Sequence, residues 1–568
     1  MKRGLVCLLT LLMLLPILGI GASTAGPQIT EGMVDGDYVF DVIDGDAVIV
    51  EYHGDAQTDL VIPHALSGYA VTAIGESAFS DHTELKTVVI PQGVTAIGRY
   101  AFLDCTNLEK VTIPEGVEVI DEMAFELCDS LSAVNIPASV QAIGNSAFYK
   151  GIITVAPENQ YYSSRDGVLF NKEQTTLIRY PVNKSGSTYA IPNTVTTLVD
   201  YAFYQCKSLT SVVIPSGITQ IGVSCFSGCE QLKTVVLPKG LTSIGDSAFS
   251  FCYSLTDVVL PETLTSVGDD AFVYCYNMTP VTIPDSVVSI GSGAFDCELS
   301  VSPNNPAYSV EDGVLFNKNK TLLIRYPSNK NAESYVIPDS VITIGDRAFQ
   351  ECYPLREVTF PNSVTSIGDS AFHYCENLTS VVLPKGLTTI GADAFSYCFK
   401  LSQAMIPDGV TAVGDYAFYD CNKLTEVVLS DSVVEIGAMA FGYVFDENEG
   451  DVAKDNFTIK GIAGSAANGY CEENGFTFTA LTQEQLMQAL TENDFVSANP
   501  VQPGGTAPVT VPKTQQTSFM EQYGLWLLIG GGAVLLIALT VILLLVLKLK
   551  RVQYVVSTDE APNDHGKK

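Results

Sequence analysis

The sequence predicts an α/β-type solenoid, mainly parallel β, because three short patterns recur in step along most of the 568 residues. The dipeptide Ala-Phe, usually followed by x-x-Cys, returns every 23 residues within each run, from Ala78-Phe79 to Ala440-Phe441. An Ile-Pro or Leu-Pro dipeptide precedes it in most copies, and Gly stands between the two in twelve of fourteen repeats. One such unit is too short to bury its apolar face alone, so the repeats must stack on one another.

Each repeat is expected to hold one short strand and one helical turn. In Leu108–Pro114, Val and Ile alternate before Pro, which suits a strand that ends where the N–H is missing. Gly222 and its counterparts suggest a tight turn with positive φ. Several Asp residues just before Ala-Phe are expected to N-cap a helical turn that buries Ala and Phe: Asp246, Asp269, Asp346, Asp369 and Asp415.

Two interruptions of the repeat are copies of each other. Residues 166–172 read Asp-Gly-Val-Leu-Phe-Asn-Lys, residues 312–318 read the same, and each copy is followed by Leu-Ile-Arg-Tyr-Pro. Apolar runs around a polar turn predict β-hairpin insertions, at about 152–190 and 299–336. They divide the array into blocks of four, five and five repeats.

The full unit, Leu-x-x-Val-x-Ile-Pro-x-x-Val-x-x-Ile-Gly-x-x-Ala-Phe-x-x-Cys, resembles the BspA-like, or Treponema-type, leucine-rich repeat over residues 55–445. The resemblance implies a leucine-rich repeat superhelix with short helical turns. It also implies a surface protein that binds host matrix proteins, other cells or mucosal ligands. Pro follows the strand here where the commonest leucine-rich repeat has Asn or Cys, so no continuous Asn ladder is expected.

The two ends of the chain predict export and anchoring. Residues 1–25 carry Lys2, Arg3, an apolar stretch and small residues, which is typical of a secretory signal peptide. Residues 524–547 form an apolar run of 24 residues, about 36 Å as a helix, which is enough for one transmembrane span. Basic residues from Lys548 onward place the tail, 548–568, in the cytoplasm. The expected location is therefore the cell membrane, single-pass, with the N-terminus and the ectodomain outside.

A second kind of anchoring is also weighed. Residues 511–515, Val-Pro-Lys-Thr-Gln, loosely resemble a sortase sorting signal, but they differ from it at the first and last positions. Detecting tail peptides that contain Tyr554 on the mature protein would exclude this alternative.

The remaining boundaries follow from where the repeat pattern stops. Residues 26–60 are expected to form an N-terminal cap, 61–445 the solenoid with its insertions, and 446–482 a C-terminal cap with a helix near 463–474 and a strand near 476–481. Residues 483–523 are expected to be a linker or stalk, because 499–517 are rich in Pro, Gly, Thr and Val.

The charge of the chain argues against two classes of partner. The formal net charge is −33; without Lys2, Arg3 and the net two positive charges from Lys548 onward, −37 remains outside. Such a surface disfavours nucleic acid and direct contact with anionic lipid. Solubility explains the acidic surface, and diffuse binding of divalent cations is the alternative explanation. Because no compact carboxylate loop is present, neither a dedicated metal site nor a cofactor is expected.

Thirteen cysteines remain after the signal peptide, and ten of them, called here the ladder cysteines, stand three residues after the repeat Phe. Export favours disulfides. Stacked repeats, however, would hold equivalent Cβ atoms about 4.8 Å apart on parallel vectors, beyond the reach of a bridge. Buried free thiols are therefore expected, and metal binding is disfavoured because no Cys-x-x-Cys is present.

No enzyme is expected. The five histidines belong to no catalytic motif. His82 takes the Cys position of its repeat and is expected to be a buried substitute, whereas His373 is expected to be exposed.

A candidate binding stripe follows from strand alternation. The residue between the inward Val and Ile must face outward, and Val and Thr predominate there. The stripe comprises Val89, Thr112, Asn135, Val213, Val236, Val259, Thr282, Thr359, Val382, Met405 and Val428. Exposed apolar rows often mark interaction sites, although β propensity alone also explains these residues.

A candidate aromatic row precedes the ladder Cys, at Phe251, Tyr274, Tyr374 and Tyr397, with Tyr253 and Tyr276 just after it. Rows of Tyr recognise sugars or proteins, and covering the helical turns is the simpler role.

Together these features predict a cell-surface protein that mediates adhesion or protein binding through its solenoid, with an extracellular protein or glycan as ligand. The alternative is a cell-envelope structural or polysaccharide-binding protein. Receptor-like signalling is disfavoured, because the tail is too short for a domain.

Overall fold

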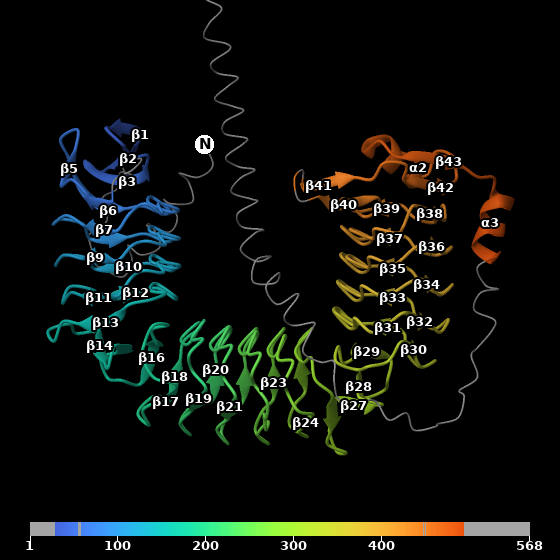
Figure 1. The fold of residues 1–568 in the computed structure, drawn as a ribbon, viewed down its shortest axis with the longest axis horizontal. Coiled ribbons are helices and arrows are strands. Elements are labelled where there is room, and N and C mark those ends of the chain that lie inside the picture. Colours follow the sequence, from blue (N-terminus) through green and yellow to red (C-terminus); the bar gives the residue numbers. More distant parts are fainter. Residues whose placement is uncertain (1–28, 55–57, 447, 449, 493–568) are drawn as a thin grey trace, which may run out of the picture. The chain divides into compact units, whose positions relative to one another are not determined.

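The computed structural model describes residues 29–54, 58–446, 448 and 450–492. It divides the chain into two units, Met1–Tyr443 with Lys454–Glu492, and Val444–Ala453 with Asn493–Lys568. The first unit holds the predicted solenoid, drawn in Figure 1. The strands β40 (Tyr443–Asp446) and β41 (Gly450–Ala453) form a two-stranded sheet, which belongs to the second unit except for Tyr443.

Each turn of the solenoid begins with a short strand that leads into Ile-Pro or its equivalent, called here the Ile-Pro strand. These strands pair in parallel with the same strand of the next turn, as in Val213↔Val236. They fall into three stacks: a first of residues 29–155, a second of 162–301, and a third of 308–443 with 454–480. In the first stack they are β4 (Asp59–Val61), β7 (Thr87–Val89), β9 (Lys110–Thr112), β11 (Ala133–Ile136) and β13 (Ile152–Val155). In the second they are β17 (Thr188–Ala190), β19 (Ser211–Val213), β21 (Thr234–Val236), β24 (Val281–Ile283) and β26 (Leu299–Val301). In the third they are β30 (Ser334–Val336), β32 (Glu357–Thr359), β34 (Ser380–Val382), β36 (Ala404–Ile406) and β38 (Glu426–Leu429).

A second strand of each turn, the Ile-Gly strand, ends just before the repeat glycine and also pairs in parallel with its neighbours. In the first stack these strands are β6 (Tyr69–Ile74), β8 (Ala96–Ile97), β10 (Val119–Ile120) and β12 (Ala142–Ile143). In the second they are β18 (Thr197–Leu198), β20 (Gln220–Ile221), β22 (Ser243–Ile244), β23 (Ser266–Val267) and β25 (Ser289–Ile290). In the third they are β31 (Thr343–Ile344), β33 (Ser366–Ile367), β35 (Thr389–Ile390), β37 (Ala412–Val413) and β39 (Glu435–Ile436).

The Ala-Phe segment forms a third ladder between turns and not the expected helical turn. The amide of Phe102 donates to the carbonyl of Ala124, one repeat further on, at 2.9 Å. The residue before Ala and the residue before Cys both have positive φ, as at Ser247 and Phe251. Two left-handed residues per turn preclude a right-handed helical turn, so the prediction of helical turns is wrong.

The expected N-cap role of the aspartates is wrong for the same reason. Their side chains bond to the neighbouring turn instead: Asp246 Oδ1 accepts the amide of Asp269 at 2.9 Å, and Asp269 Oδ1 accepts that of Ser292 at 2.8 Å. Asp346, Asp369 and Asp415 make the same bond at 2.7–2.9 Å. The aspartates therefore link neighbouring turns through hydrogen bonds from a backbone amide to the carboxylate.

The repeat glycine is selected by close packing, because the expected positive φ is not found at these positions. A Cβ at Gly98 would lie 2.8 Å from the carbonyl carbon of Gly75, and one at Gly245 would lie 2.9 Å from that of Gly222. Backbones of adjacent turns approach too closely there for any side chain.

The two insertions connect the stacks. In the first, β14 (Tyr162–Arg165), β15 (Val168–Asn171) and β16 (Thr176–Arg179) form an antiparallel meander, and β16 then pairs in parallel with β18. In the second, β27 (Tyr308–Glu311), β28 (Val314–Asn317) and β29 (Leu322–Arg325) do the same before β31. The predicted hairpins are β15–β16 and β28–β29, and each gains a third strand.

The core of each stack is a column of phenylalanine rings. Consecutive rings stack nearly parallel, as in Phe249–Phe272, with centroids 5.1 Å apart and planes at 3°. Tyr180 and Tyr326, from the two Leu-Ile-Arg-Tyr-Pro segments, begin the second and third columns by stacking on Phe203 and Phe349. Buried Val, Leu, Ala and Cys side chains fill the space around these columns.

Short elements lie at both ends of the unit. The strands β1 (Ile29–Asp35), β2 (Tyr38–Ile43) and β3 (Asp46–Tyr52) form a meander that extends the Ile-Gly sheet through β6, and β5 (Ala65–Leu66) pairs with β6. At the other end, β42 (Thr458–Gly461) and β43 (Thr477–Ala480) extend the sheet of β38. The helix α2 (Ala466–Asn474) connects β42 to β43, close to the expected helix and strand.

Several predicted segments lie outside the described residues: the signal peptide at 1–25, the stalk beyond residue 492, the span at 524–547 and the tail at 548–568. Within the described residues, no helix combines the length and hydropathy that crossing a bilayer requires.

Candidate binding surface

The middle residues of the Ile-Pro strands form one aligned row in each stack, which we call the outer column. Strand pairing sets Val213 beside Val236, and Val336 beside Thr359. The column contains all eleven residues of the predicted stripe. It also contains Val61, Ala190 and Val336, which begin the column in their stacks; Ala190 and Val336 keep the 23-residue spacing to the next member, and only Val61 departs from it.

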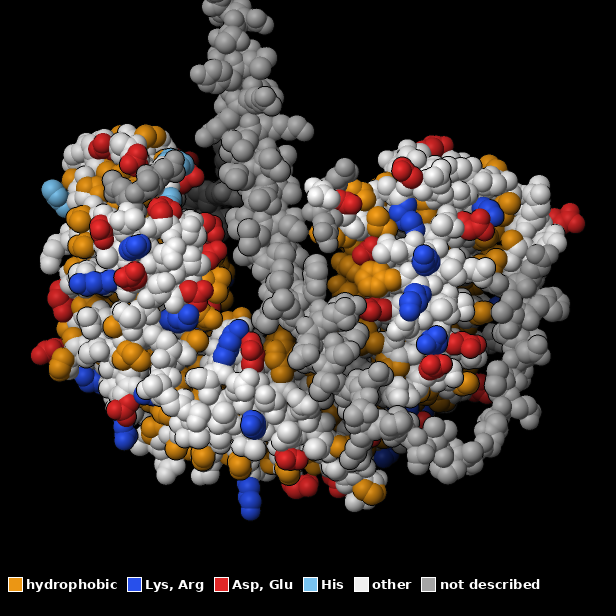
Figure 2. Space-filling model, viewed as in Figure 1, with side chains coloured by type: hydrophobic (Ala, Val, Ile, Leu, Met, Phe, Trp, Pro, Cys, Tyr) orange, Lys and Arg blue, Asp and Glu red, His pale blue; other side chains and the backbone are white. Residues whose placement is uncertain are grey.

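The second stack carries the longest exposed apolar part of the outer column. Val213, Val236 and Val259 are 54%, 68% and 80% exposed, and Ala190, next in line, is exposed as well. We call these four residues the valine patch. Figure 2 shows hydrophobic side chains gathered at the lower margin of the second stack, where Figure 1 places β17, β19 and β21.

The patch ends in a polar pair, Thr282 and Ser300, whose hydroxyl groups lie 2.8 Å apart. In the first stack the column is apolar only at Val61 and Val89, and Thr112 and Asn135 follow them, exposed. The second stack therefore offers the larger apolar surface.

In the third stack the outer column becomes steadily more covered. Val336 is 69% exposed and Thr359 is exposed, Val382 and Met405 are half-buried, and Val428 is only 6% exposed. The prediction of an exposed side chain is therefore wrong at Val428.

The cover at Val428 is the helix α3 (Gln483–Glu492), which packs against β38. Leu486 is 1% exposed, and Ala489 and Leu490, three and four residues later, are half-buried. Gln483 Nε2 also donates to Asp431 Oδ2 at 2.7 Å. Figure 1 shows α3 beside β38, with its axis along the stack.

Residues 483–492, the first part of the predicted linker, form the helix α3. A capping box begins it: the amide of Gln485 donates to Thr482 Oγ1 at 3.2 Å, and the amide of Thr482 donates to Gln485 Oε1 at 2.9 Å. The sequence signal was the Thr-x-x-Gln pattern before Leu486, Ala489 and Leu490.

The predicted aromatic row is present as two separate pairs. Phe251 and Tyr274 pack at 4.7 Å in the second stack, and Tyr374 and Tyr397 stack at 4.3 Å with planes at 2° in the third. Phe251 is 41% exposed, whereas the three tyrosines are half-buried.

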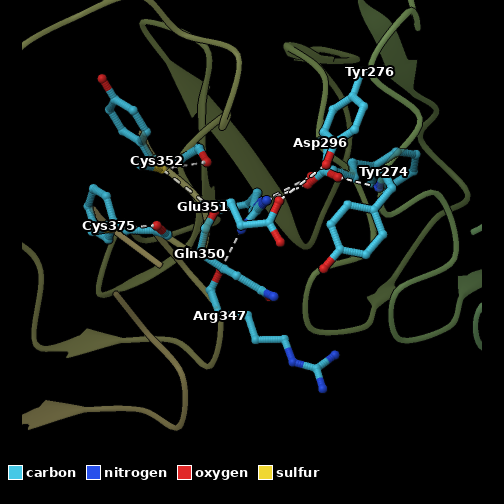
Figure 3. A network of polar contacts seen from close by, with 12 residues as sticks. Tyr274, Tyr276, Asp296, Arg347, Gln350, Glu351, Cys352 and Cys375 are labelled. Atoms are coloured by element: carbon cyan, nitrogen blue, oxygen red, sulfur yellow. Dashed lines mark hydrogen bonds and ion pairs between the residues drawn. The ribbon is translucent and has the colours of Figure 1, made fainter. Parts of the chain in front are cut away.

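A polar network joins the second stack to the third at the second insertion, β27–β29, called here the second connector (Figure 3). The first insertion, β14–β16, is the first connector. The guanidinium of Arg325 bonds to Asp296, to the carbonyl of Phe295 at 3.0 Å and to that of Arg347 at 2.6 Å. Asp296 also accepts the amide of Tyr274 at 2.5 Å. Because Arg325 and Asp296 are almost fully buried, this ion pair is a structural junction.

Near this pair lies a buried carboxylate, Glu351, which no sequence pattern singles out. Tyr276 Oη donates to Glu351 Oε2 at 3.4 Å across 75 residues of sequence. Burial raises the pKa of Glu351 above its ordinary value. Arg179 has the corresponding place in the first connector, donating to the carbonyls of Tyr149 and Tyr201 at 3.0 and 2.6 Å. The duplicated Arg within an apolar segment was the available signal.

Beside the junction is an acid-lined cavity of about 410 Å³. Its lining comprises Asp246, Ser247, Asp269, Asp270, Ser292, Asp346, Arg347, Asp369 and Ser370. Arg347 forms an ion pair with Asp270, and Asp246, Asp269, Asp346 and Asp369 accept amides of neighbouring turns. No cluster of three or more metal-ligating side chains occurs in the described part of the chain.

The ladder cysteines are structural, as predicted. All thirteen cysteines in the described residues are free and buried. The ten thiols that follow the repeat Phe donate to the carbonyl of the stacked Phe or Tyr of the preceding turn, as Cys252 Sγ does to Phe226 at 3.2 Å and Cys206 Sγ does to Tyr180 at 3.6 Å. Burial raises the pKa of Cys206 and that of Cys421 to about 12, so these thiols stay protonated and unreactive at neutral pH.

Two histidines, His82 and His373, also lie within the stacked turns. His82 Nε2 lies 2.9 Å from the carbonyl oxygen of Tyr52, the same kind of contact that the ladder thiols make, but its side chain is half-buried and not fully buried as predicted. His373 is half-buried, not exposed as predicted, beside Tyr374, Tyr397 and Ser396. Burial, with Arg347 nearby, lowers the pKa of His373 to about 4.

The stacked turns, the phenylalanine columns and the exposed sheet face define a parallel-β repeat solenoid of the kind used as a binding scaffold. The family model described as "BspA type Leucine rich repeat region" matches residues 57–174, 182–301 and 326–445, in six copies. The chain belongs to this BspA-type leucine-rich repeat family. No curated protein matches it.

Solved structures of similar proteins come from several bacteria. A leucine rich cell surface protein of Faecalibacterium prausnitzii is 26% identical, with 81% of this chain and 100% of that chain covered and a TM-score of 0.38. A leucine-rich repeat protein of Bacteroides ovatus is 23% identical over 81% of this chain and 100% of that one, with a TM-score of 0.32. The pneumococcal vaccine antigen PcpA is 18% identical over 80% and 99%, with a TM-score of 0.39.

Proposed function

We propose that this chain is a bacterial cell-surface protein that binds a partner protein through the outer face of its solenoid. The observation that carries the proposal is the valine patch, where three aligned valines are 54–80% exposed. Exposing a contiguous apolar row to water is unfavourable, and such rows mark interaction sites. Family membership and the relative described as a cell surface protein support presentation outside the cell.

The proposed anchoring is the one that the sequence predicts, a signal peptide followed, after the solenoid, by one span at 524–547. The acidic ectodomain suits a partner without a strongly anionic surface, such as a host matrix protein or another cell's surface protein. Catalysis is not part of the proposal. The thiols are buried, and burial lowers the pKa of His373 to about 4, which makes its imidazole a weak base.

The test is binding of full-length protein, displayed on cells, to a panel of matrix proteins and glycans. Val236→Glu and Val259→Glu are expected to lower protein capture at least tenfold without changing the thermal midpoint, because both side chains are exposed. Val288→Glu, at a residue 55% exposed before the Ile-Gly strand β25, is the matched control and should bind normally. Unchanged capture by the patch variants would refute the proposal.

A second candidate function, glycan binding, is favoured by one observation. Tyr374 and Tyr397 stack in parallel at 4.3 Å, which gives two flat rings with polar tips on the third stack. In the same panel, capture of glycans alone that is lost in Tyr374→Ala, but not in Val236→Glu, would replace the adhesin by a polysaccharide-binding protein.

A further inference from the structure

The valine patch is the face of a sheet, and this limits what can bind there. The backbone groups of β17, β19 and β21 already pair with one another, so an extended peptide cannot add to this face by main-chain hydrogen bonds. Only side chains are available for contact. An α-helix satisfies its own backbone and presents a row of side chains, so it is the element suited to such a surface.

In the third stack, a helix of this chain already packs against an Ile-Pro strand. There α3 packs against β38 with Leu486 only 1% exposed, while Val428 of the outer column falls to 6% exposed. Val428 occupies in the third stack the column that Val213, Val236 and Val259 occupy in the second. The structure thus contains an outer-column valine covered by an amphipathic helix.

The spacings of a helix and of the column also match. Paired strands lie about 4.8 Å apart, and a helix rises about 5.4 Å per turn. Over the three intervals of the valine patch the difference amounts to roughly 2 Å, well under one strand spacing. A straight helix along the stack can therefore set one apolar side chain per turn against each member of the patch.

We propose that the valine patch is the docking face for an amphipathic α-helix of a partner protein. The helix lies along the second stack and buries an apolar stripe at i, i+3/i+4, i+7 and i+11 against Ala190, Val213, Val236 and Val259. This inference rests on the proposed function and names its partner class.

The probe is a fluorescein-labelled, side-chain-stapled peptide of residues 482–492, titrated by anisotropy against the purified full-length chain. Binding is expected for the native peptide. At least a tenfold loss is expected for a peptide with Leu486→Asp and for protein with Val236→Glu, because each places a charge in the apolar contact. Protein with Val288→Glu should bind normally.

A second arm uses the covered valine. Leu486→Asp in the protein should release α3 from Val428 and raise the number of peptide sites on the third stack. It should also restore binding to the Val236→Glu protein. Thermal melting checks that both proteins remain folded.

The outcomes separate the two proposals. If partner capture depends on Val236 but no helical peptide binds, the helical partner is wrong and the protein-binding function stands. Should the peptide bind equally to the Val236→Glu and native proteins, with Leu486→Asp adding no site, the docking face is refuted. If Val236→Glu changes neither peptide binding nor partner capture, both proposals fall.

Discussion

Gly245 has an ordinary negative φ or extended backbone, yet a Cβ there would lie 2.9 Å from the carbonyl carbon of Gly222 and from the amide nitrogen of Val223. Both neighbours are backbone atoms of the preceding turn, which cannot move aside as a flexible side chain could. The distance between turns therefore excludes a side chain at this position, and a Cβ at Gly98, Gly268 or Gly414 would come as close to backbone of the preceding turn.

Gly245→Ala is expected to destabilise the protein by about 1–3 kcal/mol, because the added methyl must push two turns apart. Gly469→Ala is the control: this residue lies inside α2 with nothing within 4 Å of the added Cβ. There the same methyl should stabilise by about 0.5–1 kcal/mol. Chemical denaturation of both variants measures the difference, and equal effects would contradict packing as the cause.

For single residues, the sequence predicted whether a side chain is buried or exposed within its own repeat. It did not predict the contacts that the residue makes with the neighbouring turn. Cysteine burial and the outward valines follow from alternation and from the distance between turns. The hydrogen bond that Asp246 accepts from Asp269 and the close backbone approach at Gly245 both join neighbouring turns. They depend on backbone conformations that a 23-residue sequence template does not specify.

The helix α3 is the clearest case of an element that depends on one local signal. Its capping box, Thr482 with Gln485, satisfies two amides at its first turn. The rest of its stability comes from Leu486 packed against β38, because an isolated helix of 10 residues is marginal in water.

Thr482→Ala is expected to weaken α3 by about 1 kcal/mol, since the amide of Gln485 loses its acceptor. Amide hydrogen exchange in 484–490 should then accelerate about fivefold, with exchange in β32 and β34 unchanged. Thr482→Ser, which keeps the hydroxyl, should retain native exchange. Equal acceleration in both variants would show that the cap does not hold the helix.

Strands and connectors were more accessible to sequence reasoning than α3. Alternating Val and Ile before Pro gave the Ile-Pro strands, and the duplicated segments gave β15–β16 and β28–β29. The helix was missed because composition downstream of it suggested a stalk. The covered Val428 was missed with it, since nothing in β38 itself reports what lies on its outer face.

In the whole molecule, each pair of adjacent stacks is joined by one buried arginine of the connector between them, Arg179 or Arg325. Arg325 neutralises Asp296 and occupies carbonyls at the end of one stack and the start of the next, and Arg179 does the same with carbonyls in the first connector. Junction partners such as Tyr276 and Glu351 are 75 residues apart. No repeat period relates them, so sequence reasoning could not pair them.

Asp296→Asn is expected to cost about 3–5 kcal/mol, because it leaves the guanidinium of Arg325 charged and buried without its counter-ion. Asp270→Asn removes the carboxylate of a partly exposed pair with Arg347 and should cost about 1 kcal/mol or less. Denaturation midpoints of the two variants give the comparison. A loss at Asp270 as large as that at Asp296 would argue against burial as the source of the effect.

The two connectors also bear on how such a chain can change length. Arg179-Tyr180 and Arg325-Tyr326 are 146 residues apart, and this interval contains five turns and the connector that follows them. Recombination between the two copies would delete or duplicate that interval whole and leave every junction sequence intact. Lineages could therefore lengthen or shorten the displayed surface in steps of one stack, each step arriving with its own buried arginine and its own starting tyrosine.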